Sequence, residues 1–230
     1  MQKRTLLGIL IPSAMILLYL SGNYWLKELD IQWLSNEQLN YMLLFQLYGL
    51  ALSIITIIIT IKLHPASTAF LCFGNLKTTA VPVKILGIRT GDNWYKTGAS
   101  YLIVITIATS AYMYAGLGDK LNWNLLIGVL PWIVLFSLTN SFNEEIITRF
   151  AVVGILDGVM PPIRIMWIAA AIFGLVHYYG APGGYIGVIM AGFLGWVLAK
   201  SVIETRGIGI AWVVHFVQDI VIFTMLLIME

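Results

Sequence analysis

Few of the residues that cover a soluble protein are present in this sequence. Only 10% of its 230 residues are charged, whereas 60% are hydrophobic. Soluble globular proteins carry about 25% charged residues. The polar side chains here are therefore too few to cover the surface of a water-soluble protein of this length. The composition therefore excludes a soluble globular protein and predicts a polytopic membrane protein.

Cysteine and net charge are low as well. The single cysteine, Cys72, excludes an intramolecular disulfide bond. The formal net charge of +2 at pH 7 is too small to indicate nucleic-acid binding. The sequence also has no clear internal repeat at a fixed period, which a secondary transporter would usually show. The bilayer is therefore the first partner that the sequence indicates.

Apolar stretches long enough to cross a bilayer recur along the chain. A spanning helix needs about 20 predominantly apolar residues, because its backbone polar groups must be satisfied within the helix. The candidates are 5–22, 39–62, 97–117, 123–143, 164–180, 184–203 and 208–228. The fourth is expected to continue as a helix towards 157. We predict an all-α bundle of about seven transmembrane helices, forming a single domain over 1–230.

Lysine and arginine indicate which ends of the predicted spans face the cytoplasm, since cytoplasmic loops retain these residues. They collect before the first span and in the loop 63–96, as Lys3, Arg4, Lys77, Lys84, Arg89 and Lys96. We expect both segments inside, so the N-terminus is cytoplasmic. Alternation then places the turns at 157–164 and 204–207 inside. It places the turns at 119–120 and 180–184 outside, together with the C-terminus.

Ionisable residues interrupt three of the apolar stretches. They are Glu144, Glu145, His177, His215 and Asp219. Each such residue costs at least about 2.5–3.5 kcal/mol at the centre of a spanning helix, so it marks a candidate functional site. Counted from the predicted inner turns at 1.5 Å per residue, these side chains lie about 12–20 Å deep. The sequence therefore predicts a polar cavity near the middle of the membrane.

The spacing around the paired glutamates predicts how they divide their roles. Glu145 and Arg149 are four residues apart with the acid first, which favours an ion pair on one helix face. Glu144 projects about a quarter-turn away from that face. We expect Arg149 to neutralise Glu145 while Glu144 faces the cavity.

The two histidines have partners at the same spacing. His215 and Asp219 are four apart, so the carboxylate is placed to orient the imidazole ring. Phe173 and His177 share a helix face in the same way. Taken singly, each histidine fits a helix–helix contact at least as well as catalysis, because intramembrane polar contacts of this kind are common and worth about 0.6 kcal/mol.

Three motifs follow one another in the second half of the chain. They are Glu-Glu-x-x-x-Arg at 144–149, Phe-x-x-x-His at 173–177 and His-x-x-x-Asp at 215–219. In this order, each within an apolar helix, they resemble the motifs of the CPBP family of intramembrane proteases. That family is also called Abi or CAAX-protease-like, and it includes the type II CAAX prenyl endopeptidases. The resemblance covers about 123–228, the motif-bearing core.

The resemblance implies a role for each matched residue. Glu144, together with His177, would activate a water molecule for attack on a peptide carbonyl. Glu145 would be the second acid of the motif and Arg149 its charge partner. His215 would help to stabilise the tetrahedral oxyanion by donating a ring N–H.

Asp219 departs from the family pattern, because the prenyl-endopeptidase branch has asparagine at this position. An ionised aspartate only accepts hydrogen bonds and would repel an oxyanion. Either Asp219 is protonated, or it only orients His215.

The sequence does not decide whether the same peptide hydrolysis depends on a metal ion. Two histidines and a glutamate can ligate zinc and leave a fourth position for water. The ligands would be Glu144, His177 and His215, delivered by three helices. We expect metal-free glutamate chemistry without a cofactor, and keep zinc as the alternative.

The sequence thus predicts an intramembrane endopeptidase that hydrolyses a membrane-associated peptide or a lipidated protein. Non-catalytic alternatives are a membrane scaffold, a bacteriocin-immunity protein or a transporter with a carboxylate–histidine proton relay. We expect the protein in the plasma membrane of a prokaryote. Its substrate and oligomeric state are left open by the sequence.

Overall fold

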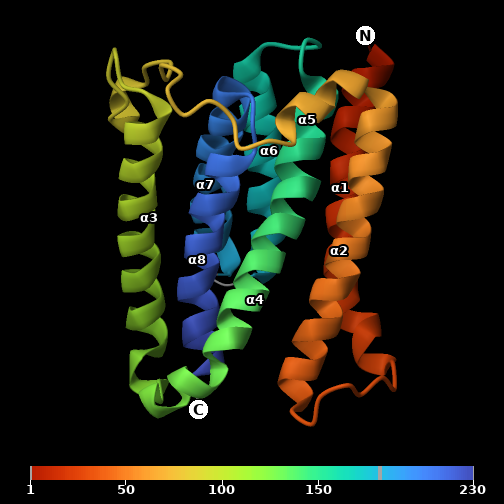
Figure 1. The fold of residues 1–230 in the computed structure, drawn as a ribbon, viewed down its shortest axis with the longest axis vertical. Helices are drawn as coiled ribbons and strands as arrows, with labels where there is room; N and C mark the ends of the chain where they lie inside the picture. The colour runs from red at the N-terminus through yellow and green to blue at the C-terminus, as the bar shows by residue number, and fades with distance from the viewer. Residues whose placement is uncertain (1, 181–182, 230) are drawn as a thin grey trace.

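The computed structural model describes residues 2–180 and 183–229. Within these ranges the chain is a bundle of α-helices, and no β-strand forms beyond isolated bridges (Figure 1). The helices are α1 (Gln2–Trp25), α2 (Glu37–Leu63), α3 (Trp94–Leu117), α4 (Leu126–Glu145), α5 (Ala151–Leu156), α6 (Pro162–Val176), α7 (Gly184–Thr205) and α8 (Gly209–Leu227). Short 3-10 helices lie at Leu26–Glu28, Pro65–Phe70, Lys84–Leu86, Gly118–Lys120, Trp123–Leu125 and His177–Tyr179.

Seven helical stretches in the described ranges are long and apolar enough to cross a membrane. Each coincides with one of the predicted spans, so the predicted all-α membrane bundle is confirmed. The fourth stretch runs over Trp123–Leu156. It contains α4, a π-helical segment Ile146–Phe150 and α5 without a break, as the predicted continuation towards 157 requires.

The beginning of α1 and the end of α8 lie at opposite ends of the bundle (Figure 1). The segment between α2 and α3 lies at the same end as the beginning of α1. The α3–α4 turn lies at the other end, beside the end of α8. These placements agree with the predicted alternation, and the cytoplasmic assignment of the first end stays a prediction from the lysines and arginines.

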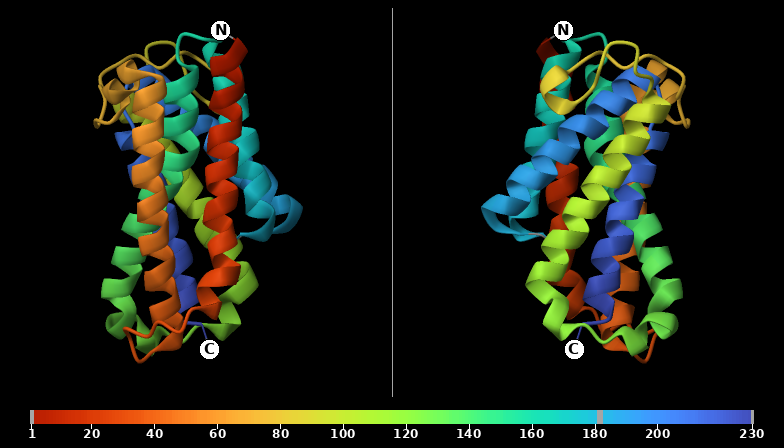
Figure 2. Two further views of the ribbon diagram at one scale, coloured as in Figure 1. Left: turned by 90° about the vertical axis from the view of Figure 1, so that its right-hand side faces the viewer. Right: turned by 90° about the vertical axis from the view of Figure 1, so that its left-hand side faces the viewer.

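The α6–α7 hairpin departs from that alternation. It turns back at about half the height of the bundle and projects to one side, with α7 strongly tilted (Figure 2). α6 has only 15 residues before it passes into the 3-10 helix. α6 alone is therefore about 22 Å long, and it reaches the length of a candidate membrane span only together with that 3-10 helix. The prediction that the turn at 180–184 reaches the outer surface is corrected accordingly; residues 181 and 182 of that turn lie outside the described residues.

Glycines let α6 and α7 pack closely. A Cβ atom placed on Gly174 would lie 2.8 Å from the Val188 carbonyl oxygen and 3.0 Å from the Cα atom of Gly192. Backbone atoms cannot rotate away as a side-chain end can, so this contact requires glycine at 174. The close approach matters for the site because α6 also carries Phe173 and His177.

We expect Gly174→Ala to lower the free energy of unfolding by about 1–3 kcal/mol, because the new methyl group forces the two helices apart. Gly192→Ala is the matched control. A Cβ at 192 would meet its nearest atom, the Ala170 carbonyl oxygen, at an ordinary 3.6 Å, and alanine favours the helix by about 1 kcal/mol. Thermal unfolding of both variants in detergent measures the difference. Equal stability of the two variants would contradict the close packing at Gly174.

Candidate functional site

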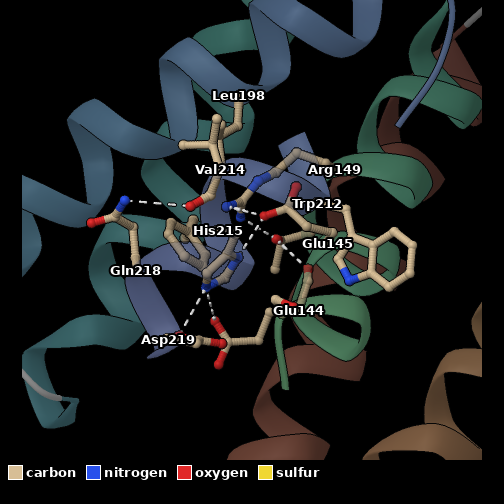
Figure 3. A network of polar contacts seen from close by, with 12 residues as sticks. Glu144, Glu145, Arg149, Leu198, Trp212, Val214, His215, Gln218 and Asp219 are labelled. Atoms are coloured by element: carbon tan, nitrogen blue, oxygen red, sulfur yellow. Dashed lines mark hydrogen bonds and ion pairs between the residues drawn. The ribbon is translucent and has the colours of Figure 1, made fainter. Parts of the chain in front are cut away.

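The three motifs meet in space inside the bundle. The Oε2 atom of Glu144 lies 4.0 Å from Nε2 of His177 and 3.7 Å from Nε2 of His215. Asp219 Oδ1 lies 3.6 Å from the same His215 nitrogen. Figure 3 shows Glu144, His215 and Asp219 pointing toward one another from α4 and α8. The convergence predicted from the depth of these residues is confirmed.

The helix that carries the paired glutamates changes its winding just after them. Glu145 is the last residue of α4, and the π-helical segment Ile146–Phe150 follows, with all five residues buried. π turns within α-helices are rare and frequently lie at functional sites. Arg149 lies in this segment, and its Nη2 atom is 2.5 Å from Glu145 Oε1. The predicted ion pair is confirmed, despite the altered winding.

Arg149 is fully buried between polar and aromatic partners. Its guanidinium carbon lies 3.7 Å from the centre of the Phe173 ring, and its Nη1 atom donates a hydrogen bond to the Thr148 hydroxyl. The Phe173 ring also lies 4.3 Å from the His177 ring, centre to centre. Phe173 therefore links the Arg149–Glu145 ion pair to the second motif.

His215 is oriented by Glu145 rather than by Asp219. Its Nδ1 atom lies 2.7 Å from Glu145 Oε1, a hydrogen-bond distance, whereas the nearest Asp219 oxygen is 3.6 Å from Nε2. Asp219 faces the ring without a hydrogen bond, so the carboxylate that forms the hydrogen bond is Glu145 and not the residue four positions along α8. Spacing along one helix brings two side chains together, but the carboxylate of the neighbouring α4 reaches the ring nitrogen that faces it. The other nitrogen, Nε2, is thereby directed at Glu144.

His177 is oriented by the end of its own helix. α6 ends at Val176, and His177 Nδ1 lies 2.8 Å from the Phe173 carbonyl oxygen. A carbonyl oxygen only accepts, so Nδ1 carries the proton and donates it. The second nitrogen, Nε2, is left facing Glu144.

Asn140 holds two of the carboxylates and Tyr19 holds Asn140, and the motifs identified neither residue. The Asn140 amide nitrogen donates one hydrogen bond to Glu144 Oε1 and one to Asp219 Oδ2, both 3.1 Å long. The buried Tyr19 of α1 donates its hydroxyl to the Asn140 carbonyl oxygen at 2.8 Å. Asn140 has a readable signal, because it precedes Glu144 by one helical turn. Tyr19 has none in the sequence.

We expect Asn140→Leu to lower kcat about 100-fold, because Glu144 and Asp219 both lose the group that holds them, and small misplacements of reacting groups carry penalties of this size. Tyr19→Phe should lower kcat less, about three- to tenfold, since Asn140 keeps its other contacts. Tyr48→Phe is the control, because its hydroxyl also donates to a neighbour, the Leu18 carbonyl, but away from the site. Steady-state kinetics with any cleaved peptide measure all three, and a loss in Tyr48→Phe equal to that in Tyr19→Phe would contradict the positioning role.

A cavity of about 230 Å³ lies against these groups. Glu144, His177, His215, Asp219 and Asn140 supply polar atoms to its wall, and apolar residues of α3, α7 and α8 form much of the rest. Glu144 Oε2 is buried and has no hydrogen-bond partner among the described residues. A water molecule in hydrogen-bond contact with both Glu144 Oε2 and His177 Nε2, about 2.8 Å from each, fits their 4.0 Å separation.

The residues do not form a metal site as they stand. Within the described ranges, no group of three or more His, Cys, Asp or Glu side chains is placed to hold a metal ion. Tetrahedral zinc with bonds of about 2.0–2.1 Å brings its ligand atoms to about 3.3–3.4 Å from one another. The separations of 3.7 and 4.0 Å from Glu144 to the two histidines are larger. The zinc alternative therefore does not fit this arrangement.

Comparison with known proteins matches one part of the chain to a family. Residues 126–221 match the model of the family described as type II CAAX prenyl endopeptidase Rce1-like. No curated protein and no solved structure matches the chain. The matched segment contains all three motifs and most of the helices that build the cavity. Residues 126–221 of this integral membrane protein are therefore similar to the Rce1-like family of CAAX-type proteases, in agreement with the resemblance of the motifs to type II CAAX prenyl endopeptidases.

Proposed function

We propose that this protein is an intramembrane, glutamate-dependent endopeptidase in which Glu144 and His177 activate a water molecule. One observation carries the proposal. Glu144 Oε2 is buried, has no hydrogen-bond partner among the described residues, and faces the Nε2 atoms of two histidines within 4.0 Å. A general base must have this kind of access to the water that it deprotonates.

The proposed reaction uses only side chains of the cavity. Glu144 takes a proton from water, and the oxygen of that water forms a bond to the carbonyl carbon of the substrate. His177 Nε2 accepts a hydrogen bond from the second O–H of the water and so directs the lone pair of the water oxygen at the carbonyl carbon. Glu144 then passes its proton to the amide nitrogen as the C–N bond breaks, which releases a carboxylic acid and an amine; in water the acid gives its proton to the amine.

His215 is the proposed stabiliser of the oxyanion. Glu145 accepts a hydrogen bond from Nδ1, and the doubly protonated ring presents Nε2–H to the cavity. A donor fixed in position before the reaction stabilises the developing negative charge without reorganising. Asp219 also faces Nε2, at 3.6 Å, and Asn140 holds it beside Glu144. We assign Asp219 the role of keeping His215 in place rather than contacting the oxyanion itself.

The location, orientation and substrate preference of the protein are part of the same proposal. We place the protein as one domain in a prokaryotic plasma membrane, with the N-terminus and the segment 63–96 in the cytoplasm, because lysine and arginine collect there. The aspartate at 219, in place of the asparagine of the prenyl-endopeptidase branch, favours a peptide-processing member over one that needs a prenylated substrate.

Purified protein and a library of quenched fluorescent peptides, prenylated and unprenylated, test the proposal. We expect cleavage of unprenylated peptides that is lost in His177→Ala and unaffected by a chelator. Loss on chelation that zinc restores would replace the metal-free mechanism by a metal-dependent one. Absence of any cleavage by the wild type, with His177→Ala still active in cells, would favour a scaffold or an immunity protein.

A further inference from the structure

Three exposed tyrosines cluster at the turn of the α6–α7 hairpin. Tyr178, Tyr179 and Tyr185 are 42%, 84% and 79% exposed. The Tyr178 ring packs edge-on against both of the others, with ring centres 5.2 Å from Tyr179 and 5.5 Å from Tyr185. None of the three hydroxyls has a hydrogen bond to a described residue. The cluster thus presents three phenolic hydroxyls that are available to form hydrogen bonds with a ligand.

The position of this cluster along the bundle is unusual for tyrosine. Exposed aromatic residues normally mark the two membrane–water interfaces. Here such residues stand near both ends of the bundle: Tyr24, Trp33, Tyr114 and Trp123 at one end, Tyr95 and Trp167 at the other. The α6–α7 turn lies between these two levels, at about half height (Figure 2). The hairpin turn that carries the three tyrosines therefore lies between the levels of the other exposed aromatic residues, which is where a spanning bundle crosses the hydrocarbon core.

Hydroxyl groups at that depth are costly unless they find a partner. Transfer of a hydroxyl from water to an apolar environment without a hydrogen bond is unfavourable. Packing does not explain three such groups, because phenylalanine makes the same ring contacts without the hydroxyl. A ligand that accepts or donates hydrogen bonds in the membrane does explain them.

The cluster borders the proposed catalytic cavity. His177 directly precedes Tyr178, and Gly180 lines the cavity. A Cβ atom on Gly180 would lie 3.3 Å from the His177 ring, so the turn packs against the histidine itself. Whatever the tyrosines bind is therefore held next to the reacting groups.

A membrane-embedded substrate needs hydrogen-bond partners of the kind that these hydroxyls supply. A peptide bond within a helix is shielded, because its carbonyl oxygen accepts a hydrogen bond from the fourth residue along. Hydrolysis requires local unwinding, which exposes backbone N–H and C=O groups, and hydrocarbon offers these groups no partner. Hydroxyls that both donate and accept can replace the lost helical hydrogen bonds.

We propose that Tyr178, Tyr179 and Tyr185 form a docking surface for the unwound backbone of a membrane-spanning substrate segment, next to the cleaved bond. The inference rests on the proposed function and narrows its substrate class to a peptide that is helical in the bilayer before it is cleaved. The phenolic hydroxyls hold the unwound backbone on one side of the cleaved bond, while the carbonyl of that bond lies at Glu144 and His177.

The test removes only the hydroxyls. A triple variant with Tyr178→Phe, Tyr179→Phe and Tyr185→Phe is compared with a control triple, Tyr24→Phe, Tyr95→Phe and Tyr114→Phe. The control residues are also exposed and also lack a hydroxyl hydrogen bond to described residues, but they lie at the ends of the bundle. Both triples and the wild type are assayed in liposomes on a membrane-spanning peptide and on a short water-soluble peptide with the same cleavage site.

The first triple should raise KM for the membrane-spanning peptide at least tenfold, with kcat changed less than threefold and the short peptide affected less than threefold. The control triple should match the wild type. Equal losses on both peptides, equal losses in both triples, or no loss would each overturn the proposal.

Binding to the inactive protein separates this inference from the proposed function. Resonance energy transfer between a labelled membrane-spanning peptide and Glu144→Gln protein measures affinity without cleavage. A tenfold weaker affinity when the three Tyr→Phe changes are added supports the docking surface, even if the wild type cleaves nothing. Unchanged affinity contradicts the docking surface, even if the wild type is an active protease.

Discussion

Glu144→Gln should lower kcat for peptide hydrolysis about 10³-fold and leave the fold intact. The amide has nearly the same shape as the carboxylate and still accepts the hydrogen bond from Asn140. It cannot take a proton from water, and a positioned general base contributes about 10²–10⁴-fold to the rate. Single-turnover cleavage by purified protein measures the loss, and thermal unfolding shows that the fold is kept.

Two variants make this result specific. Glu144→Asp keeps the charge but withdraws the carboxylate by one methylene, so its activity should fall between those of the wild type and Glu144→Gln. Glu37→Gln, at the exposed beginning of α2, should be fully active. Retention of more than a tenth of the wild-type kcat in Glu144→Gln would show that another group activates the water.

Arg149→Met should destabilise the protein by about 3–5 kcal/mol and abolish its activity. Arg149 is completely buried, and its loss leaves Glu145 in the interior without its cation. Breaking a buried ion pair in this way is much more damaging than replacing both partners. Since Glu145 also orients His215, the ring loses its position as well. Denaturation in mixed detergent or thermal unfolding measures the loss of stability.

The surface ion pair between Arg206 and Asp157 provides the control. It is 2.8 Å long, comparable to the buried pair, but both side chains are partly exposed. Arg206→Met should therefore cost less than about 1 kcal/mol. The double variant Glu145→Gln with Arg149→Met should regain part of the stability, because no uncompensated charge remains. Equal losses in Arg149→Met and Arg206→Met would contradict the buried charge network.

Hydrophobic run length and motif spacing predicted the spans and the ionisable residues that meet at the cavity. A bilayer constrains helix length so strongly that the seven spans follow from composition alone. The Glu145–Arg149 ion pair followed from the four-residue spacing on one helix. These features are local, and local patterns survive in the folded protein.

The features that sequence reasoning missed depend on contacts between helices. Tyr19 reaches Asn140 across 121 residues of sequence, and no local pattern connects the two. The choice of Glu145 over Asp219 as partner of His215 depends on how α4 faces α8. The half-height turn of α6–α7 depends on tilt, which the length of an apolar run does not determine.

The most direct test of the account is cleavage of a membrane-spanning peptide in liposomes by wild-type protein and by Glu144→Gln, with the products weighed by mass spectrometry. The account predicts two fragments from the wild type whose masses sum to the mass of the substrate plus one water. It predicts intact substrate from Glu144→Gln over the same time. Equal cleavage by both proteins would contradict the role of Glu144, and an intact substrate with both would contradict peptide hydrolysis of such a segment.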